Sequence, residues 1–490
     1  MNNPKPNILL LMTDQQRGDA LGIEGHPILQ TPYLDSLSMS GIRFTRAYSA
    51  CPTCVPARRT LMSGKTPHGH GVYINYDTYM DCPTLPECFS KAGYQTHLAG
   101  KLHLWPKRKL YGFHSSDWAD GPGCKKEPND YTKFLECNNI NIPDVSQAHG
   151  MDGNGWVARP WHLEERFHIT NWTTDRAINF LERRDPTLPF FLKVSYFHPH
   201  QPGVPPEYYF NMYMNMELPE PARSNWSKID EIPRRGISVS SPRINLDRQV
   251  IKQFQAGYYG CITHIDHQIG RILKIIPSNT IIIFTSDHGE MLGDHGYARK
   301  GYAFEGSSRI PLLFNFPSEM HIPKKQVRKE VTELMDIMPT LLDAAGIPVP
   351  DSVDGKSLMP LITGKDSSWR EYIHGEIAAL ADSSNIPQTG MQYLTDGKRK
   401  YIWHPGTNEE FFFNLEIDPK ETDNLISVSQ YANDIKLWKE RLIKELDGRD
   451  EGFTDGRELI KKDGISRLCS PELARSGMPY VKNGKWIENA

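Results

Sequence analysis

Short strand-like runs alternate with helical periodicity along the first 300 residues of the chain. Buried strands are predicted for four stretches, at residues 7–12, 94–99, 188–197 and 281–284. Apolar residues recur every three or four positions from 251 to 276, which predicts a long amphipathic helix, and a shorter helix is predicted for 54–63. Strands that alternate with helices are typical of an α/β fold with a doubly wound, mostly parallel sheet.

Polar and charged side chains follow each predicted strand at its carboxyl end. Asp14 follows the first strand, Lys101 the second, His200 the third and Asp287 the fourth. In open α/β sheets, ligands bind outside the carboxyl ends of the strands. The pattern therefore predicts a site along that edge of the sheet.

Two long stretches, 104–170 and 203–245, are rich in Pro, Gly, Asn, Trp and charged residues and show little periodicity. We expect them to be excursions over the active face that shape the substrate pocket. Aromatic faces and arginine suit a sugar or an aryl group, although a polar loop with anchoring tryptophans fits the same residues equally well. The candidate contacts are Trp105, Trp156, Arg159, Trp161 and His162.

The pattern changes after about residue 375. Two β-rich segments, 392–394 and 401–403, flank Asp396-Gly397, which predicts a hairpin, and a helix is predicted near 430–447. We therefore divide the chain into a catalytic domain, 1–375, and a smaller C-terminal α+β subdomain, 376–490, built on a short antiparallel sheet.

Composition narrows the classes of function. The 490 residues are 38% hydrophobic and 23% charged, as in ordinary soluble globular proteins with a large core. A net charge of −3 gives no basic footprint for nucleic acid, and no apolar run is long enough to span a bilayer. The first apolar run has no cleavage site after it, so it is no signal peptide; with eight dispersed cysteines, this predicts a cytoplasmic protein.

The most informative motif is Cys54-Val55-Pro56-Ala57-Arg58, which is followed by Thr60, Ser63 and Gly64. Cys-x-Pro-x-Arg is the pattern at which a cysteine is oxidised to formylglycine. The alternative interpretation takes Cys51 and Cys54 as a CxxC redox pair or half of a zinc site, but no second CxxC follows at suitable spacing.

With this motif and five others in the same order between residue 7 and about residue 312, the chain resembles the type I sulfatase family of the alkaline-phosphatase-like superfamily. The resemblance implies the alkaline-phosphatase-like fold and a maturation enzyme that converts Cys54 to formylglycine. The hydrate of that aldehyde has two hydroxyls. One attacks sulfur, and deprotonation of the other expels sulfate and restores the aldehyde.

The resemblance also implies one divalent metal ion, held by Asp14, Gln15, Asp287, His288 and an oxygen of the residue formed from Cys54. Many sulfatases have Asp in place of Gln15 and Asn in place of His288. Oxygen ligands favour Ca²⁺, which we expect, but Mg²⁺ fits them too and an imidazole leaves Mn²⁺ open. Without the resemblance, Asp14 fits a helix cap and His288 a partner of a metal ligand.

Five further residues surround the sulfate in the arrangement that the resemblance implies. Arg58, one helical turn after Cys54, holds the nucleophile, while Lys101 and Lys300 bind the sulfate. His103 is the base that breaks the hydrate, and His200 binds sulfate and protonates the leaving alcohol. Lys101 and His103 both face the site only if the chain bends after the strand.

Taken singly, each of these is an ordinary surface lysine or a hydrogen-bonded histidine, and His198 competes with His200. Together they predict hydrolysis of a sulfate monoester, on a sulfated carbohydrate or an aryl sulfate, to an alcohol and sulfate. The alternative is a formylglycine-dependent hydrolase of phosphonate monoesters or phosphodiesters. A third hypothesis is a non-catalytic glycan-binding or redox protein, but each motif position still carries a competent residue.

Overall fold

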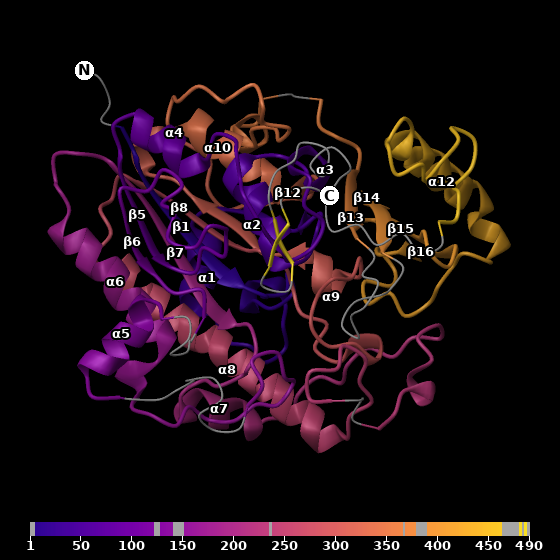
Figure 1. Cartoon of the computed structure of the whole chain (residues 1–490), viewed down its shortest axis with the longest axis horizontal. Coiled ribbons are helices and arrows are strands. Elements are labelled where there is room, and N and C mark those ends of the chain that lie inside the picture. The colour runs from indigo at the N-terminus through magenta and orange to yellow at the C-terminus, as the bar shows by residue number, and fades with distance from the viewer. Residues whose placement is uncertain are drawn as a thin grey trace.

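An eight-stranded sheet forms the centre of the computed structural model (Figure 1). The structure describes residues 5–121, 128–140, 151–234, 238–365, 368–378 and 390–462, and two strands near the C-terminus. The strand order is β11-β2-β10-β8-β1-β7-β5-β6. In chain order these strands are β1 (Asn7–Asp14), β2 (Ile42–Phe44), β5 (Gln95–Gly100), β6 (Ser115–Trp118), β7 (Phe190–Pro199), β8 (Thr280–Ser286), β10 (Leu312–Asn315) and β11 (Gln326–Arg328).

The sheet is mostly parallel, as the sequence predicts. The five adjacent strands β8, β1, β7, β5 and β6 all pair in parallel. Strand β10 runs antiparallel to both β8 and β2. The central strand β1 lies between β7 and β8 and is buried along its whole length. Because Asp14 pairs with Pro199 and Thr13 with Ser286, the carboxyl ends of the three strands lie side by side.

Helices cover both faces of the sheet. On one face, Leu9 and Leu11 of β1 pack with α1 (Pro32–Met39), α6 (Ile169–Arg183) and α8 (Arg248–Leu273). On the other, Ile8, Leu10 and Met12 pack with α2 (Cys54–Ser63), α4 (Leu85–Lys91) and α10 (Ile337–Ala344). This confirms the doubly wound α/β fold, including the predicted strand before Asp14 and the predicted helix that begins at Cys54.

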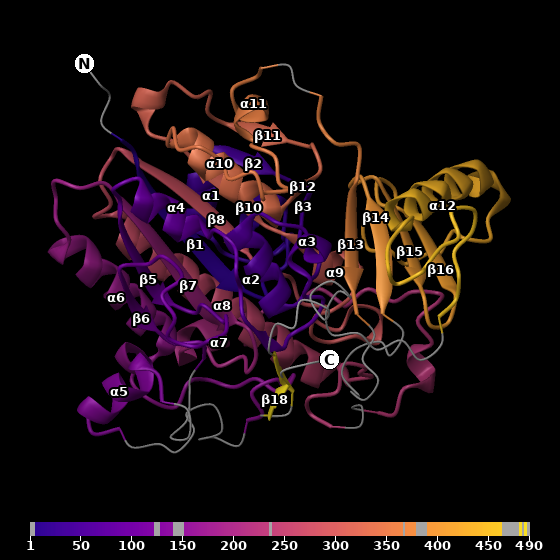
Figure 2. The same cartoon turned by 45° about the horizontal axis from the view of Figure 1, so that its top comes forward.

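A four-stranded antiparallel sheet follows, with α12 (Ala432–Leu446) packed on its outer side (Figure 2). Its strands are β13 (Ile373–Ile377), β14 (Met391–Thr395), β15 (Arg399–His404) and β16 (Glu409–Asn414). The β14–β15 turn at Asp396-Gly397, where Gly397 has a φ of +75°, confirms the predicted hairpin. The domain boundary expected at 375/376 falls inside β13.

Smaller elements complete the described chain. One three-stranded sheet consists of β3 (Ala47–Tyr48), β9 (Arg309–Ile310) and β12 (Thr332–Glu333). In another, β17 (Tyr480–Lys482) pairs with β18 (Lys485–Ile487) and with β4 (Asp77–Thr78), so the C-terminal strands return to the first part of the chain. The remaining helices are α3 (Pro67–His70), α5 (Asp130–Cys137), α7 (Glu207–Met214), α9 (Glu305–Ser308) and α11 (Met359–Ile362).

The stretches 104–170 and 203–245, whose sequences show little periodicity, still contain short regular elements. The first stretch contains β6 and α5 and the second contains α7. Strand β6 is a polar four-residue edge strand held by its pairing with β5, so it leaves no hydrophobic pattern. Among the described residues, no helix combines the length and the apolar character needed to cross a bilayer.

Candidate active site

Cys54 is the first residue of α2 and is 1% exposed. The preceding Thr53 is extended, as expected for the residue before a helix, and the Val55 N–H donates to Asn75 Oδ1 at 2.8 Å. Asp14, at the end of β1, and Asp287 and His288, just after β8, face this helix N-terminus. The sequence therefore brings three separate segments to one buried point.

In the described part of the chain, Asp14, Cys54, Asp287 and His288 form a cluster whose ligand atoms all lie within 4.8 Å of one another. Cys54 Sγ is 3.1 Å from His288 Nε2 and 3.8 Å from Asp14 Oδ1. His288 Nδ1 donates to the Gly289 carbonyl oxygen at 3.0 Å, which leaves Nε2 facing the cluster. Two carboxylates and an imidazole oriented in this way fit a divalent cation.

Two cations balance the carboxylates of this cluster. Arg58 bridges them, with Nη2 2.9 Å from Asp14 Oδ2 and Nε 2.9 Å from Asp287 Oδ2, and Lys101 Nζ is 2.7 Å from Asp14 Oδ2. Burial and the neighbouring Cys54 would raise the pKa of Asp14, but Lys101, His200 and Arg58 hold it well below its usual value. Burial and the Asp14 charge raise the pKa of Asp287.

Residue 54 lies in a strongly positive environment. Burial opposes ionisation of the Cys54 thiol, but Lys300, Lys101 and His288 bring its pKa well below the ordinary value, and a hydrogen bond with His103 acts in the same direction. A side chain here that carries negative charge is therefore stabilised. Such an environment suits both an anionic reacting group and a bound anion.

Lys300 joins two other predicted residues. Its Nζ is 2.6 Å from Gln15 Oε1 and 2.7 Å from His200 Nε2. Burial lowers the pKa of Lys300. Burial and the nearby Lys300 charge lower the pKa of His200 to about 4. His200 is therefore neutral at pH 7, with Nδ1 donating to the Gln201 carbonyl oxygen at 2.8 Å and Nε2 accepting from Lys300.

The bend expected after β5 is present. The Leu102 and His103 N–H groups both donate to Asp120 Oδ1, at 2.9 and 2.7 Å, and His103 has a φ of +54°. This left-handed conformation turns the chain so that Lys101 and His103 both reach the site. Asp120 has no motif around it in the sequence, and the sequence analysis missed it.

The suggested substrate contacts remain predictions, and the structure shows only where their side chains lie. Arg159 and His162 are exposed, whereas Trp161 packs edge-on against His162 and His168. Trp105 is half-buried, and Trp156 lies in a hydrophobic cluster with Phe210 and Ile251.

His198 and Cys51 lie close to the site but do not belong to its cluster of possible metal ligands. His198 is buried, stacks on His168 and bonds through Nδ1 to the His200 carbonyl oxygen at 3.0 Å. Cys51 Sγ lies 3.2 Å from the Tyr73 carbonyl oxygen, and the six described cysteines are all free. The zinc hypothesis needs both Cys51 and Cys54, but the described cluster includes Cys54 alone.

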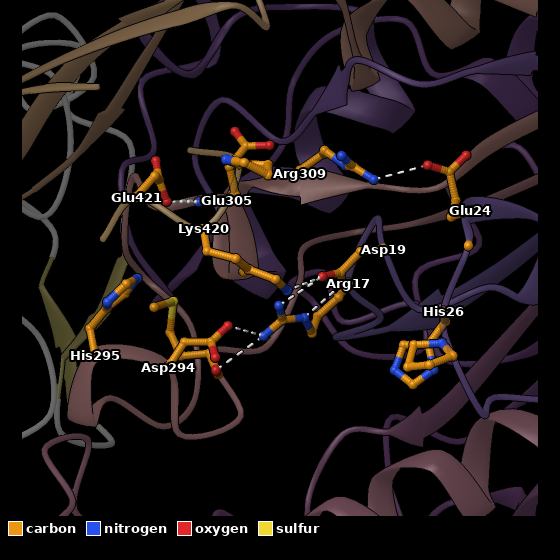
Figure 3. Close-up of a pocket in the computed structure, with 15 residues that line it drawn as sticks. Arg17, Asp19, Glu24, His26, Asp294, His295, Glu305, Arg309, Lys420 and Glu421 are labelled. Carbon is orange, nitrogen blue, oxygen red and sulfur yellow. Dashed lines mark hydrogen bonds and ion pairs between the residues drawn. The ribbon is translucent and has the colours of Figure 1, made fainter. Parts of the chain in front are cut away.

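Arg17 links the segment after β1 to the segment after β8 through hydrogen bonds (Figure 3). Its Nη1 donates to the carbonyl oxygens of Glu290 and Met291, both at 3.1 Å, and to Asp294 Oδ2 at 2.8 Å. Arg17 also pairs with Asp19 at 2.8 Å and lines a cavity of about 320 Å³ that Lys420 and other C-terminal residues help to enclose. Cys54 does not line this cavity.

Comparison with known proteins identifies the family. The family model described as Sulfatase matches residues 6–347, and that described as N-sulphoglucosamine sulphohydrolase, C-terminal, matches residues 293–447. The chain belongs to the sulfatase family. It is a sulfuric ester hydrolase, and its fold is that of the alkaline phosphatase superfamily, as the resemblance implies.

Sulfatases and phosphonate hydrolases are both among its relatives. An arylsulfatase of Clostridium perfringens is 42% identical over 95% of this chain and 99% of its own length. A multifunctional alkaline phosphatase superfamily protein of Trinickia caryophylli is 30% identical over 90% of this chain and 95% of its own length. The crystal structure of the phosphonate monoester hydrolase of Agrobacterium radiobacter superposes with a TM-score of 0.76 at 26% identity, covering 90% of this chain and 95% of that one.

Proposed function

We propose that this sulfatase hydrolyses aryl sulfates or sulfated carbohydrates through the hydrate of a formylglycine made from Cys54. The observation that carries the proposal is the placement of Cys54: buried, at a helix N-terminus, and within reach of two carboxylates, an imidazole and two lysines. The name of the arylsulfatase relative supports the substrate class.

The residues around position 54 have separate roles in the proposed reaction. Arg58 and Lys101 neutralise Asp14 and Asp287, so an anionic ester can approach without meeting two uncompensated carboxylates. Lys101 and Lys300 bind the sulfate oxygens, where charge builds up in the transition state. His103, hydrogen-bonded to residue 54, accepts the proton of the second hydrate hydroxyl when sulfate leaves.

We further propose that Asp14, Gln15, Asp287, His288 and residue 54 hold one divalent cation, which we expect to be Ca²⁺, with Mg²⁺ or Mn²⁺ as alternatives. The acidic pair and His288 Nε2, which faces it, support such a site. When bound, the cation would polarise the sulfate and favour ionisation of the attacking hydroxyl.

His200 needs a proton before it can protonate a leaving alcohol. In the structure its Nε2 accepts from Lys300 Nζ, 2.7 Å away, and its pKa of about 4 keeps it neutral. A bound sulfate ester would add negative charge beside His200 and favour its protonated form. Because Lys300 already donates a hydrogen bond to His200, we propose that the Lys300–His200 pair delivers the proton to the alcohol oxygen.

Substrate recognition beyond the sulfate is assigned to Trp105, Arg159, Trp161 and His162, which the sequence nominated for a sugar or an aryl ring. A maturation enzyme that makes formylglycine is the required protein partner. The six free cysteines support the proposal of a reducing, cytoplasmic location.

A second candidate activity is hydrolysis of phosphonate monoesters or phosphodiesters at the same site. Gln15 and His288, which replace the Asp and Asn of many sulfatases, favour it, as does the structural similarity to a phosphonate monoester hydrolase. Relative rates on an aryl sulfate, a phosphonate monoester and a phosphodiester separate the two. We expect the sulfate to be turned over fastest.

The decisive test is peptide mass spectrometry of residue 54 in protein purified from its native host. We expect an aldehyde in place of the thiol, and we expect Cys54→Ala to abolish turnover while the protein stays folded. An unmodified Cys54 in active native protein, or unchanged turnover in Cys54→Ala, would overturn the mechanism. Protein from a foreign host is not informative, because that host can lack the maturation enzyme.

A further inference from the structure

Glu290 is a fully buried carboxylate that accepts a hydrogen bond from Gln15, one of the proposed metal ligands. Within the described part of the chain, four neutral N–H donors surround it. The Leu292 and Arg299 backbone N–H groups donate to Oε1, the first at 2.9 Å. The side-chain amides of Gln15 and Gln201 donate to Oε2, the second at 2.6 Å. Glu290 is therefore held as an acceptor on all sides.

This arrangement fixes which way the Gln15 amide points. Its Nε2 donates both to Glu290 Oε2 and to Gln201 Oε1, the latter at 2.6 Å. Because these two acceptors face the amide nitrogen, the amide oxygen must point the opposite way, and it lies 2.6 Å from Lys300 Nζ. A neutral glutamine has no such preference of its own, since its two ends have nearly the same shape.

The backbone that carries Glu290 is also held in place. Arg17 Nη1 donates to the Glu290 carbonyl oxygen at 3.1 Å. The same nitrogen pairs with Asp294 at 2.8 Å (Figure 3). The carboxylate therefore has a fixed position relative to Gln15, which lies two residues before Arg17. Orientation of a ligand by a hydrogen-bonded carboxylate behind it is a common way to tune a metal site.

We propose that Glu290 is a positioning residue that directs the Gln15 oxygen toward Lys300 and the cation. This inference rests on the proposed function, because it assigns the Gln15 oxygen to that site. Replacing Glu290 by glutamine sets an NH₂ group against those of Gln15 and Gln201. Rotation of the Gln15 amide relieves the conflict, but it turns a donor toward Lys300 and the cation.

The test is a cycle of three variants: Glu290→Gln, Gln15→Glu, and the swap that combines them. In the swap, the carboxylate at position 15 accepts from the amide at position 290 and still presents an oxygen to Lys300. The matched control is Asp266→Asn, which alters a buried carboxylate that accepts from the Tyr33 and Leu34 backbone N–H groups, at 3.1 and 2.8 Å.

Metal-free protein is titrated with Ca²⁺, and in parallel with Mn²⁺, while the melting temperature is followed without substrate. We expect Glu290→Gln to weaken binding roughly 10- to 100-fold and to lower kcat at saturating metal by a similar factor. Gln15→Glu alone sets two carboxylates against each other and should also bind less tightly than the swap, which should recover binding. Asp266→Asn should bind metal like the wild type.

The inference is wrong if Glu290→Gln binds both metals like the wild type, if neither metal binds to the wild type, or if the swap is no better than Glu290→Gln. Should Glu290→Gln fail to fold, the swap decides, because it must then fold and bind. A wild type that binds Ca²⁺ but hydrolyses no sulfate ester would instead contradict the proposed function. The two failures are therefore distinguishable.

Discussion

At the scale of single residues, two adjacent arginines of α2 show how partners decide a role. Arg58 and Arg59 are both buried. Arg58 donates to Asp14 and Asp287, each at 2.9 Å, so it belongs to the site. Arg59 donates to the carbonyl oxygens of Thr78 and Tyr79, at 3.2 and 2.9 Å, and holds the following loop. In the proposed mechanism, the same type of side chain therefore serves chemistry at one position and folding at the next.

We expect Arg58→Lys to lower kcat roughly 100-fold or more, because a lysine cannot bridge two carboxylates with a planar fork. Arg59→Lys is the matched control. It should lower the free energy of unfolding by about 1–2 kcal/mol and leave kcat within about threefold of the wild type. Steady-state kinetics and urea unfolding of both variants check this. Equal losses of kcat would mean that Arg58 has no special role.

Sequence reasoning nominated the residues that lie in motifs and missed those that orient them. Cys54, Asp14, Asp287 and His288 each lie in a short pattern or at the end of an apolar strand, and the structure brings them together. Glu290 and Gln201 lie directly beside such motifs, in Asp-His-Gly-Glu and Pro-His-Gln-Pro, but nothing in their own spacing signals a role. Asp120 is found only when the chain is folded, because it bonds to backbone 17 and 18 residues away.

At the scale of elements, burial decided what could be predicted. Strands β1, β7 and β8 are buried along their lengths and leave clear apolar runs, so their positions followed from the sequence. Helix α5 is only eight residues long and buries three of them, and β6 buries one of four, so each is too short to leave a recognisable pattern. Pairing with β5 and packing on Trp172 create these elements.

The carboxyl end of β5 depends on a glycine. Gly100 has a φ of +100°, and a Cβ there would lie 2.2 Å from the Ser195 carbonyl oxygen of β7. We expect Gly100→Ala to separate the two strands, to lower the free energy of unfolding by about 2–4 kcal/mol, and to reduce kcat at least about 10-fold by moving Lys101 and His103.

Gly93→Ala is the control for the backbone strain alone. Gly93 has a φ of +84°, and nothing lies within 4 Å of the Cβ that alanine would add. Gly93→Ala should lower the free energy of unfolding by only about 1–2 kcal/mol and leave kcat unchanged. Chemical unfolding and kinetics of the two variants give the comparison. A Gly100→Ala enzyme no more impaired than Gly93→Ala would show that the strand end tolerates displacement.

At the scale of the whole molecule, two lysines join the C-terminal sheet to the main body. Lys400, on β15, is fully buried and lies 2.8 Å from Glu305, 2.9 Å from Glu421 and 2.7 Å from the Ala303 carbonyl oxygen. Lys420 is half-exposed and lies 2.9 Å from Asp19. Both lysines connect the C-terminal sheet to the rest of the molecule, but one is buried and the other is exposed to solvent. Their contributions to the free energy of unfolding should therefore differ.

Lys400→Met should lower the free energy of unfolding by roughly 3–5 kcal/mol, because it leaves the buried Glu421 and the half-buried Glu305 without their cation. Lys420→Met should lower the free energy of unfolding by less than about 1 kcal/mol, as expected for a solvent-exposed ion pair. Urea unfolding at pH 8 measures both. Similar small losses would mean that water reaches the Lys400 site.

The Lys400→Met defect should also depend on pH, in a direction that Glu421 determines. Burial and the neighbouring Glu305 raise the pKa of Glu421 to about 7 even with Lys400 present, and loss of that cation raises it further. A carboxyl whose pKa is higher in the folded state keeps its proton on folding, so stability is lost as the pH rises through that value. The destabilisation should therefore be smaller at pH 6 than at pH 8. A defect of constant size across this range would show that Glu421 does not titrate in the folded variant, and that the two sheets are held together by packing instead of by this charge.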